Sequence, residues 1–195
     1  MMNVGITGGI GSGKSTVCKI FETLDIPVYY SDWHARILSD THPDIVSGVT
    51  KLLGGSIYQS GKMDRKRVGE IVFNDKEKLN ALNHIIHPVV AAHFEEWKMM
   101  HNDYPYILKE AAILFESGAY KQVDQIITVS APVDLRIDRV VKRDGISRED
   151  VLSRINNQMK DEDKIKQSDY VIYCNDVDLV IPQVLEIHHA LIDRD

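Results

Sequence analysis

The chain has 195 residues with a formal net charge of -6, and 44% of its residues are hydrophobic. This length and composition suit one globular domain that carries an inserted lobe. The acidic balance argues against a basic surface for nucleic acid, and no apolar run approaches the length of a membrane span. The N-terminus shows no signal peptide. We therefore expect a cytoplasmic protein without nucleic-acid or membrane partners, acting as a monomer or weak homo-oligomer.

The cysteines and histidines form no recognisable metal motif. Cys18 and Cys174 lie outside any C-x-x-C pair, and we expect both to be small buried apolar side chains. His84 and His87 stand three residues apart and can share a helix face. A zinc site would need a further ligand that the sequence does not identify.

The residues near the N-terminus contain a sequence pattern typical of a phosphate-binding loop. Residues 8–15 fit the pattern G-x-x-x-x-G-K-[ST]. Glycines let the backbone approach a ligand closely, and their inward N–H groups form a concave nest for phosphate oxygens. We expect Lys14 to reach the β- and γ-phosphates of ATP and Ser15 to ligate Mg²⁺. The expected nucleotide-binding residues of this loop are Gly9, Gly11, Ser12, Gly13, Lys14, Ser15 and Thr16.

The sequence around this loop provides the context that the motif requires. Residues 3–7 form a short apolar run, typical of a buried parallel strand. After the loop, apolar residues recur at helical spacing from Val17 to Leu24. A glycine-rich turn with a chance Lys-Ser pair is the alternative. The order of strand, loop and helix favours a phosphate loop whose helix begins at Lys14.

Apolar runs elsewhere predict the remaining strands of a parallel sheet. They lie at residues 26–30, 106–110, 125–130 and 170–174. Glu110 ends one of these runs and is a candidate for a strand-end acid, although Lys109 interrupts the run. The predicted fold class is α/β, with a parallel sheet of the P-loop NTPase type flanked by helices, an inserted helical substrate lobe and a short lid.

Residues 33–100 have a mainly helical pattern, interrupted at His42-Pro43. Pro88 is expected to kink or break a long helix near His87. Because this block lies between two predicted strands, it has the layout of a lobe inserted into an α/β core. We expect a core that carries the phosphate loop at 1–31 and 104–195 and a helical lobe at 32–103.

A basic helix is predicted after the fourth strand, and it carries Arg136, Arg139 and Arg143. Scattered charges of this kind usually form a solvated helix face. Here the basic run follows a core strand and precedes a loop, where a lid over phosphates can lie. A capping-box pattern at 147–150 begins another helix, and the polar residues 160–167 indicate a mobile segment. The expected lid covers about 143–167.

Asp32 follows the predicted strand at 26–30. Ligands bind outside the carboxyl ends of strands in open α/β sheets, so Asp32 is expected near the phosphate loop. An acid in the first turn of a helix is also a common stabilising residue without any catalytic role. From position alone, both interpretations stay open.

Taken together, these patterns resemble the dephospho-CoA kinase family over nearly the whole length of the chain. The phosphate loop alone fits many nucleotide kinases, but Asp64-Arg65, His87-Pro88 and Leu114-Phe115-Glu116 are far more specific. The resemblance also includes Asp32 with Ala35-Arg36, Val72-Phe73, Leu82-Asn83 with Ile86, Arg139, Arg143-Asp144, Gln158, residues 168–172 and Asn175.

The resemblance implies transfer of the ATP γ-phosphate to the ribose 3′-hydroxyl of dephospho-CoA. It implies Asp32 as general base, with Lys14 and Arg143 as the other catalytic residues, and it implies ATP and Mg²⁺ as cofactors. The residues implied at the nucleotide beyond the loop are Arg139, Arg143 and Asn175. The residues implied at the acceptor substrate are Asp32, Arg36, Arg65 and His87.

Two positions depart from the family pattern. Tyr30 stands where the family often has an acid, and Ala112 stands where it commonly has a proline. Both departures concern substrate packing. Two other functions are considered: a small-molecule P-loop kinase acting on a nucleoside monophosphate, and a nucleotide-dependent switch protein. The helical insert disfavours the first, and an acceptor-activating Asp32 has no use in the second.

Overall fold

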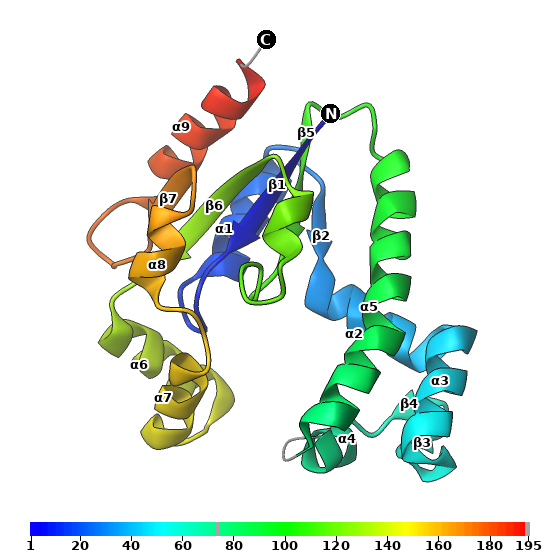
Figure 1. Ribbon diagram of the computed structural model, residues 1–195. Coiled ribbons are helices and arrows are strands. Elements are labelled where there is room, and N and C mark those ends of the chain that lie inside the picture. The colour runs from blue at the N-terminus through cyan, green and yellow to red at the C-terminus, as the bar shows by residue number, and fades with distance from the viewer. Residues whose placement is uncertain (73–74, 194–195) are drawn as a thin grey trace. The chain divides into compact units, whose positions relative to one another are not determined.

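The computed structural model describes residues 1–72 and 75–193. It divides into two compact units, one formed by Met1–Tyr30 with His101–Asp195 and the other by Ser31–Met100. Figure 1 follows both units along the chain. The sequence also predicts a helix that ends near Phe73 and a cap at Asn74-Asp75 for the helix that follows. Residues 73 and 74 lie outside the described residues, and Asp75 is the N-cap of that next helix.

The first unit is built on a five-stranded parallel sheet. Its spatial order is β2-β5-β1-β6-β7, and each neighbouring pair is parallel. β1 lies in the centre, so its carboxyl end opens the phosphate loop in the middle of one sheet edge. The strands are β1 (Met2–Thr7), β2 (Val28–Tyr30), β5 (Tyr106–Glu110), β6 (Gln125–Ser130) and β7 (Tyr170–Tyr173). The predicted fold class is confirmed.

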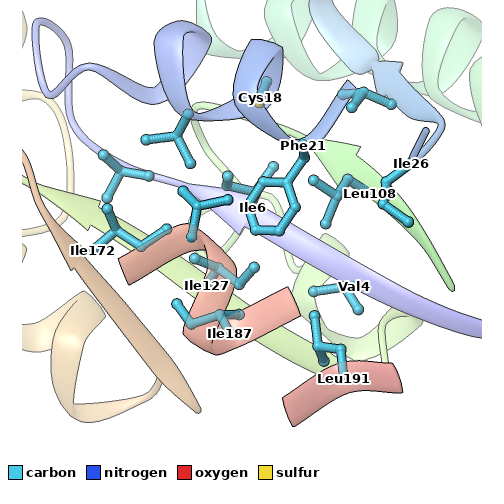
Figure 2. Packing of buried hydrophobic residues seen from close by; sticks show 14 of the residues in the cluster. Val4, Ile6, Cys18, Phe21, Ile26, Leu108, Ile127, Ile172, Ile187 and Leu191 are labelled. Atoms are coloured by element: carbon cyan, nitrogen blue, oxygen red, sulfur yellow. The ribbon is translucent and has the colours of Figure 1, made fainter. Parts of the chain in front are cut away.

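The core of this unit lies between the sheet and two helices from opposite ends of the chain. Figure 2 shows Phe21 among the strand side chains, with Ile187 and Leu191 packed nearby. Phe21 is fully buried, and replacing such a side chain with alanine costs about 3–5 kcal/mol. The helices of the unit are α1 (Lys14–Thr23), the 3-10 helix η2 (Ala119–Gln122), α6 (Val133–Asp144), α7 (Arg148–Asn156), α8 (Asp161–Lys166) and α9 (Val180–Ile192).

The second unit is mainly helical and has its own apolar core. Ile45, Val49 and Ile57 are fully buried in that core. A two-stranded antiparallel hairpin lies between its second and third helices. The elements of the unit are α2 (Ser31–Thr41), α3 (Pro43–Leu53), the 3-10 helix η1 (Gly55–Ile57), β3 (Tyr58–Gln59), β4 (Lys62–Met63), α4 (Arg65–Val72) and α5 (Lys76–Met99).

Two expectations differ from the structure. Of the kink or break expected at Pro88, the break does not occur, because α5 continues through Pro88 to Met99. A proline removes a single N–H from the helical ladder, and the turns on both sides are retained. Residues 160–167, expected to be a mobile polar segment, contain helix α8, and the Lys164 side chain is fully buried. A paired charge, described below, explains how a lysine is buried there.

Candidate active site

The phosphate loop has the backbone conformation that its glycines permit. Gly11 and Gly13 have φ values of 78° and 97°, in the left-handed region that side chains disfavour. Gly13 is the N-cap of α1, which begins at Lys14 as expected. The first N–H groups of a helix have no carbonyl acceptors within it. This end of α1 therefore directs N–H donors and a positive dipole end into the loop, as an anion site requires.

A buried ion pair joins the loop to the neighbouring strand. The Lys14 ammonium is bound to the Glu110 carboxylate, and their side chains are only 13% and 8% exposed. Glu110 is the last residue of β5, so the strand-end acid predicted from a weak pattern lies at the loop. Lys109, which interrupted that pattern, is buried and donates to Gln122 Oε1 at 3.1 Å. Its partner explains why a lysine is tolerated in a buried strand.

Helix α6 places its arginines in different surroundings. The Arg139 guanidinium donates to the Gly11 carbonyl at 3.4 Å and to the Cys174 carbonyl at 2.9 Å, and it pairs with Asp176. Arg139 therefore lies against the loop. The Arg143 side chain is 62% exposed and pairs with its neighbour Asp144 at 2.6 Å.

Asn175 follows β7 at the same edge of the sheet as the loop. The adjacent Cys174 lies beside Gly13, where an added Cβ would be 3.1 Å from the Cys174 sulfur. Asn175 Oδ1 accepts from the N–H groups of Val177 at 3.1 Å and Asp178 at 2.8 Å. These bonds hold the turn after β7, which brings residue 175 to the loop.

The two cysteines are buried, as predicted. Cys18 is fully buried in α1, and burial raises the pKa of its thiol to about 12. Burial also raises the pKa of Cys174 above its ordinary value. Neither thiol is activated as a nucleophile.

The helical unit carries the residues expected at the acceptor substrate. Asp32 and Arg36 are exposed, and they lie one turn apart on α2. Arg65 donates to the Arg36 carbonyl at 2.7 Å and pairs with Asp40 at 2.9 Å, so α2 and α4 are joined there. His87 is exposed on α5.

A second ion pair, in which only the lysine is fully buried, was not expected from the sequence. Lys164 Nζ lies 3.1 Å from Glu116 Oε1, which also accepts the Met159 N–H at 2.8 Å. Burial alone would raise the pKa of the Glu116 carboxyl. The hydrogen bonds lower it by more than burial raises it, so the pKa lies below its ordinary value. The only sequence signal was the triplet 114–116. This pair joins α8 to the segment after β5.

Another residue that sequence reasoning did not select is Arg136. The residue is 2% exposed, and its Nε donates to the Ile10 carbonyl of the phosphate loop at 2.9 Å. Its charge resembles the scattered charges of a solvated helix face, which hid its position beneath the loop. Only the register of α6 against the loop distinguishes it from Arg143.

A phosphate loop after the central strand of a parallel sheet, with an acid at the end of the neighbouring strand, is the arrangement of P-loop nucleotide-binding proteins. The family model described as dephospho-CoA kinase matches residues 2–179. The chain belongs to the dephospho-CoA kinase family. It is therefore an ATP-dependent phosphotransferase.

Individual relatives agree with this assignment over almost their whole length. The chain is 38% identical to the dephospho-CoA kinase of Bacteroides fragilis strain YCH46, over 95% of this chain and 91% of that protein. It is 41% identical to the dephospho-CoA kinase of Chlorobaculum tepidum, over 97% and 94%. A solved structure of dephospho-CoA kinase from Campylobacter jejuni is 27% identical, with a TM-score of 0.70 over 97% of this chain and 96% of that one.

These comparisons lend no support to a nucleoside monophosphate kinase or a switch protein. Within residues 1–72 and 75–193, no group of three or more His, Cys, Asp or Glu residues is arranged to hold a metal ion, His84 and His87 included. No helix among the described residues combines the length and the apolar composition needed to cross a membrane.

Proposed function

We propose that the chain transfers the γ-phosphate of ATP to the ribose 3′-hydroxyl of dephospho-CoA, which gives coenzyme A and ADP. The 3′-oxygen forms a bond to the γ-phosphorus, while the bond from that phosphorus to the β,γ-bridging oxygen breaks. The hydroxyl proton leaves to a base on the protein. The observation that carries the proposal is the phosphate loop with Lys14 held at the strand-end Glu110, in a chain of this family.

The loop supplies the positive field for the transferred phosphoryl group. The transition state is loose and anionic, so positioning and charge neutralisation dominate its stabilisation. The N-terminal end of α1 and its glycine loop hold the phosphates, and the Lys14 ammonium exchanges Glu110 for the β- and γ-phosphate oxygens.

The donors at this site also fit Mg²⁺. The Ser15 hydroxyl, in the first turn of α1, and the Glu110 carboxylate are hard oxygen donors of the kind that Mg²⁺ prefers. Ser15 would ligate the ion, and Glu110, once separated from Lys14, would hold its water shell. The ion supplies neutralisation of charge on the β- and γ-phosphates.

Asp32 is the proposed general base. It lies in the first turn of α2, two residues beyond the carboxyl end of β2, and its side chain is exposed. A carboxylate beside the acceptor hydroxyl orients it and takes its proton. Arg36, one turn further along α2, together with Arg65 and His87, would contact the phosphate-bearing parts of dephospho-CoA. Arg65 is already held by Asp40, so it presents a fixed guanidinium.

Further contacts to the nucleotide come from the elements after β6. Arg139 and Asn175 lie at the loop edge and would contact ATP. Arg143, exposed near Gly145, belongs to a lid of about 143–167 that would bring it to the transferred phosphate. The Lys164–Glu116 pair holds the last part of this segment, so the moving part would lie before residue 158.

We also propose a cytoplasmic location and a monomer or weak homo-oligomer without nucleic-acid partners.

An acceptor panel tests the proposed function. The purified protein is incubated with ATP, Mg²⁺ and either dephospho-CoA or each common nucleoside monophosphate, and ADP release is measured. We expect a kcat/KM for dephospho-CoA at least about a hundredfold above that for any monophosphate, because acceptor groups on the helical unit stabilise only the larger substrate. Faster turnover with a monophosphate would contradict the assignment.

A further inference from the structure

Arg136 lies beneath the phosphate loop rather than facing a ligand. Its side chain is only 3% exposed. A Cβ at Gly9 would collide with the Arg136 guanidinium, and one at Gly11 would collide with the Arg136 carbonyl. Position 9 therefore requires a glycine because Arg136 of α6 packs against it, whether or not a ligand binds on the other side. The guanidinium fills the space under the loop.

Both backbone polar groups of Ile10 are bound by side chains from distant elements. The Ile10 carbonyl accepts from Arg136 Nε at 2.9 Å, and the Ile10 N–H donates to Gln158 Oε1 at 2.9 Å. Gln158 lies just after α7, some 148 residues along the chain. Two hydrogen bonds of opposite sense fix the two peptide planes that flank Ile10. Their orientation decides whether neighbouring carbonyls point towards a bound anion or away from it.

The charge of Arg136 is neutralised within the protein. Arg136 Nη1 lies 3.0 Å from Asp161 Oδ2, whose side chain is 14% exposed in the first turn of α8. Ser130 Oγ lies 3.5 Å from the same carboxylate oxygen. A buried charge requires such a partner. Because the guanidinium is committed to Ile10 and Asp161, it is a support for the loop and not a ligand of the nucleotide.

We propose that Arg136, Asp161 and Gln158 are positioning residues for nucleotide binding. Arg136 draws the Ile10 carbonyl away from the anion nest, and Asp161 fixes the Arg136 guanidinium. Gln158 fixes the Ile10 N–H. The affinity of the loop for phosphates thus depends on two residues from the α7–α8 region. The inference rests on the proposed function for its choice of nucleotide, and it concerns binding alone.

The experiment changes one contact at a time with little change in side-chain volume. Gln158→Met keeps the length of the side chain and loses the strong acceptor for the Ile10 N–H. Asp161→Asn keeps the shape of the carboxylate and removes its charge from Arg136. Lys78→Gln is the matched control, because Lys78 forms an exposed ion pair with Asp75 at the start of α5, in the other unit. For each variant, the Kd of ADP and of ATP is measured by calorimetry, well below the melting temperature.

We expect Gln158→Met and Asp161→Asn each to weaken nucleotide binding by about tenfold, the usual effect of one lost buried hydrogen bond to a preorganised site. The KM for ATP should rise in step, while the KM for dephospho-CoA and the Kd values of the control stay within about twofold of the parent. Arg136→Lys should not restore the parent affinity, since one ammonium cannot reproduce the planar fork to Ile10 and Asp161.

Lower melting temperatures with unchanged nucleotide affinity in folded Gln158→Met and Asp161→Asn would overturn the proposal and leave a purely structural role. Failure of this proposal and failure of the proposed function give different results. A parent protein that binds ATP but makes no coenzyme A would refute the reaction and leave the positioning role measurable. A parent that makes coenzyme A, with variants that bind normally, would refute the positioning role alone.

Discussion

The ammonium of Lys14, the first residue of α1, is bound to the carboxylate of Glu110, the last residue of β5. The pair lies at the edge of the sheet where the phosphate loop opens. Without nucleotide, each charge compensates the other in a mostly buried site, where isolated charges would be costly. In the proposed mechanism, binding of ATP exchanges one anion for another at Lys14 and releases the Glu110 carboxylate to the Mg²⁺ site.

Removal of the Lys14 charge should abolish most turnover. Lys14→Met is expected to lower kcat by about 10²–10³-fold, the typical loss when one preorganised donor to a developing charge is removed. Steady-state kinetics at saturating ATP measure the effect. A variant with kcat near that of the parent would contradict the catalytic role.

The Lys14 variant also needs a stability control, because it leaves Glu110 buried without its lysine. Loss of one partner of a buried ion pair costs about 3–5 kcal/mol of folding free energy. The double variant Lys14→Met with Glu110→Gln should regain most of the melting temperature without regaining activity. Recovery of both would mean that the lysine acts only on stability.

The Ser15 hydroxyl should set the dependence on Mg²⁺. Ser15→Ala is expected to raise the Mg²⁺ concentration for half-maximal activity by about tenfold, as loss of one ligand weakens the hold on the ion. Nucleotide affinity without Mg²⁺ should change little. Thr23→Ala is the matched control, since this hydroxyl lies at the other end of α1 and donates to the Ile20 carbonyl. An unchanged Mg²⁺ titration would exclude Ser15 as a ligand.

Asp32→Asn separates a general base from a helix-stabilising acid. Loss of a general base lowers kcat by about 10²–10⁴-fold and leaves the Kd of ATP nearly unchanged. Asp32 lies in the first turn of α2, where loss of its charge costs only about 0.3–1 kcal/mol, so the melting temperature should fall only slightly. Asp44→Asn is the control, because Asp44 is an exposed acid in the first turn of α3. Parent-like turnover in Asp32→Asn would remove this residue from the mechanism.

The strands and the phosphate loop were predictable because their signals are local. The runs at 106–110 and 125–130 match β5 and β6 residue for residue, and α1 begins at Lys14 as the motif requires. The tertiary roles were less predictable. Arg136 and Arg143 stand on the same helix in similar sequence surroundings, yet one is buried under the loop and the other is exposed. Only packing distinguishes them.

The polar segment at 160–167 is a second case in which tertiary packing could not be predicted from the sequence. Its composition favours a mobile segment, but Lys164 is buried against Glu116, 48 residues before it in the chain. Such a long-range ion pair leaves no periodic signal in the sequence. Pro88 is the converse case, because a strong local helix breaker is overridden by the long helix around it.

His34 should make the helical unit sensitive to mild acid. Burial first, and then the neighbouring His93 ring, whose centroid is 4.8 Å away, together lower the pKa of His34 from 6.5 to about 4. Between these two values the unfolded chain binds more protons than the folded one. The free energy of unfolding therefore falls as the pH drops from about 6.5 to about 4.

A pH series of melting temperatures for the parent and His34→Asn tests this prediction. The variant should show a shallower decline across that range, because asparagine does not titrate. The difference between the two proteins should be nearly constant above pH 7. Parallel curves over the whole range would show that His34 does not contribute to the acid sensitivity.

The most direct test of the proposed reaction is the position of the transferred phosphate. The protein is incubated with ATP, Mg²⁺ and dephospho-CoA, and the product is identified by mass spectrometry and phosphorus NMR alongside an ADP assay. We predict one coenzyme A, phosphorylated at the ribose 3′-oxygen, for each ADP formed, with no product from Lys14→Met. ADP release without coenzyme A, or phosphate at another position of the acceptor, would contradict the account.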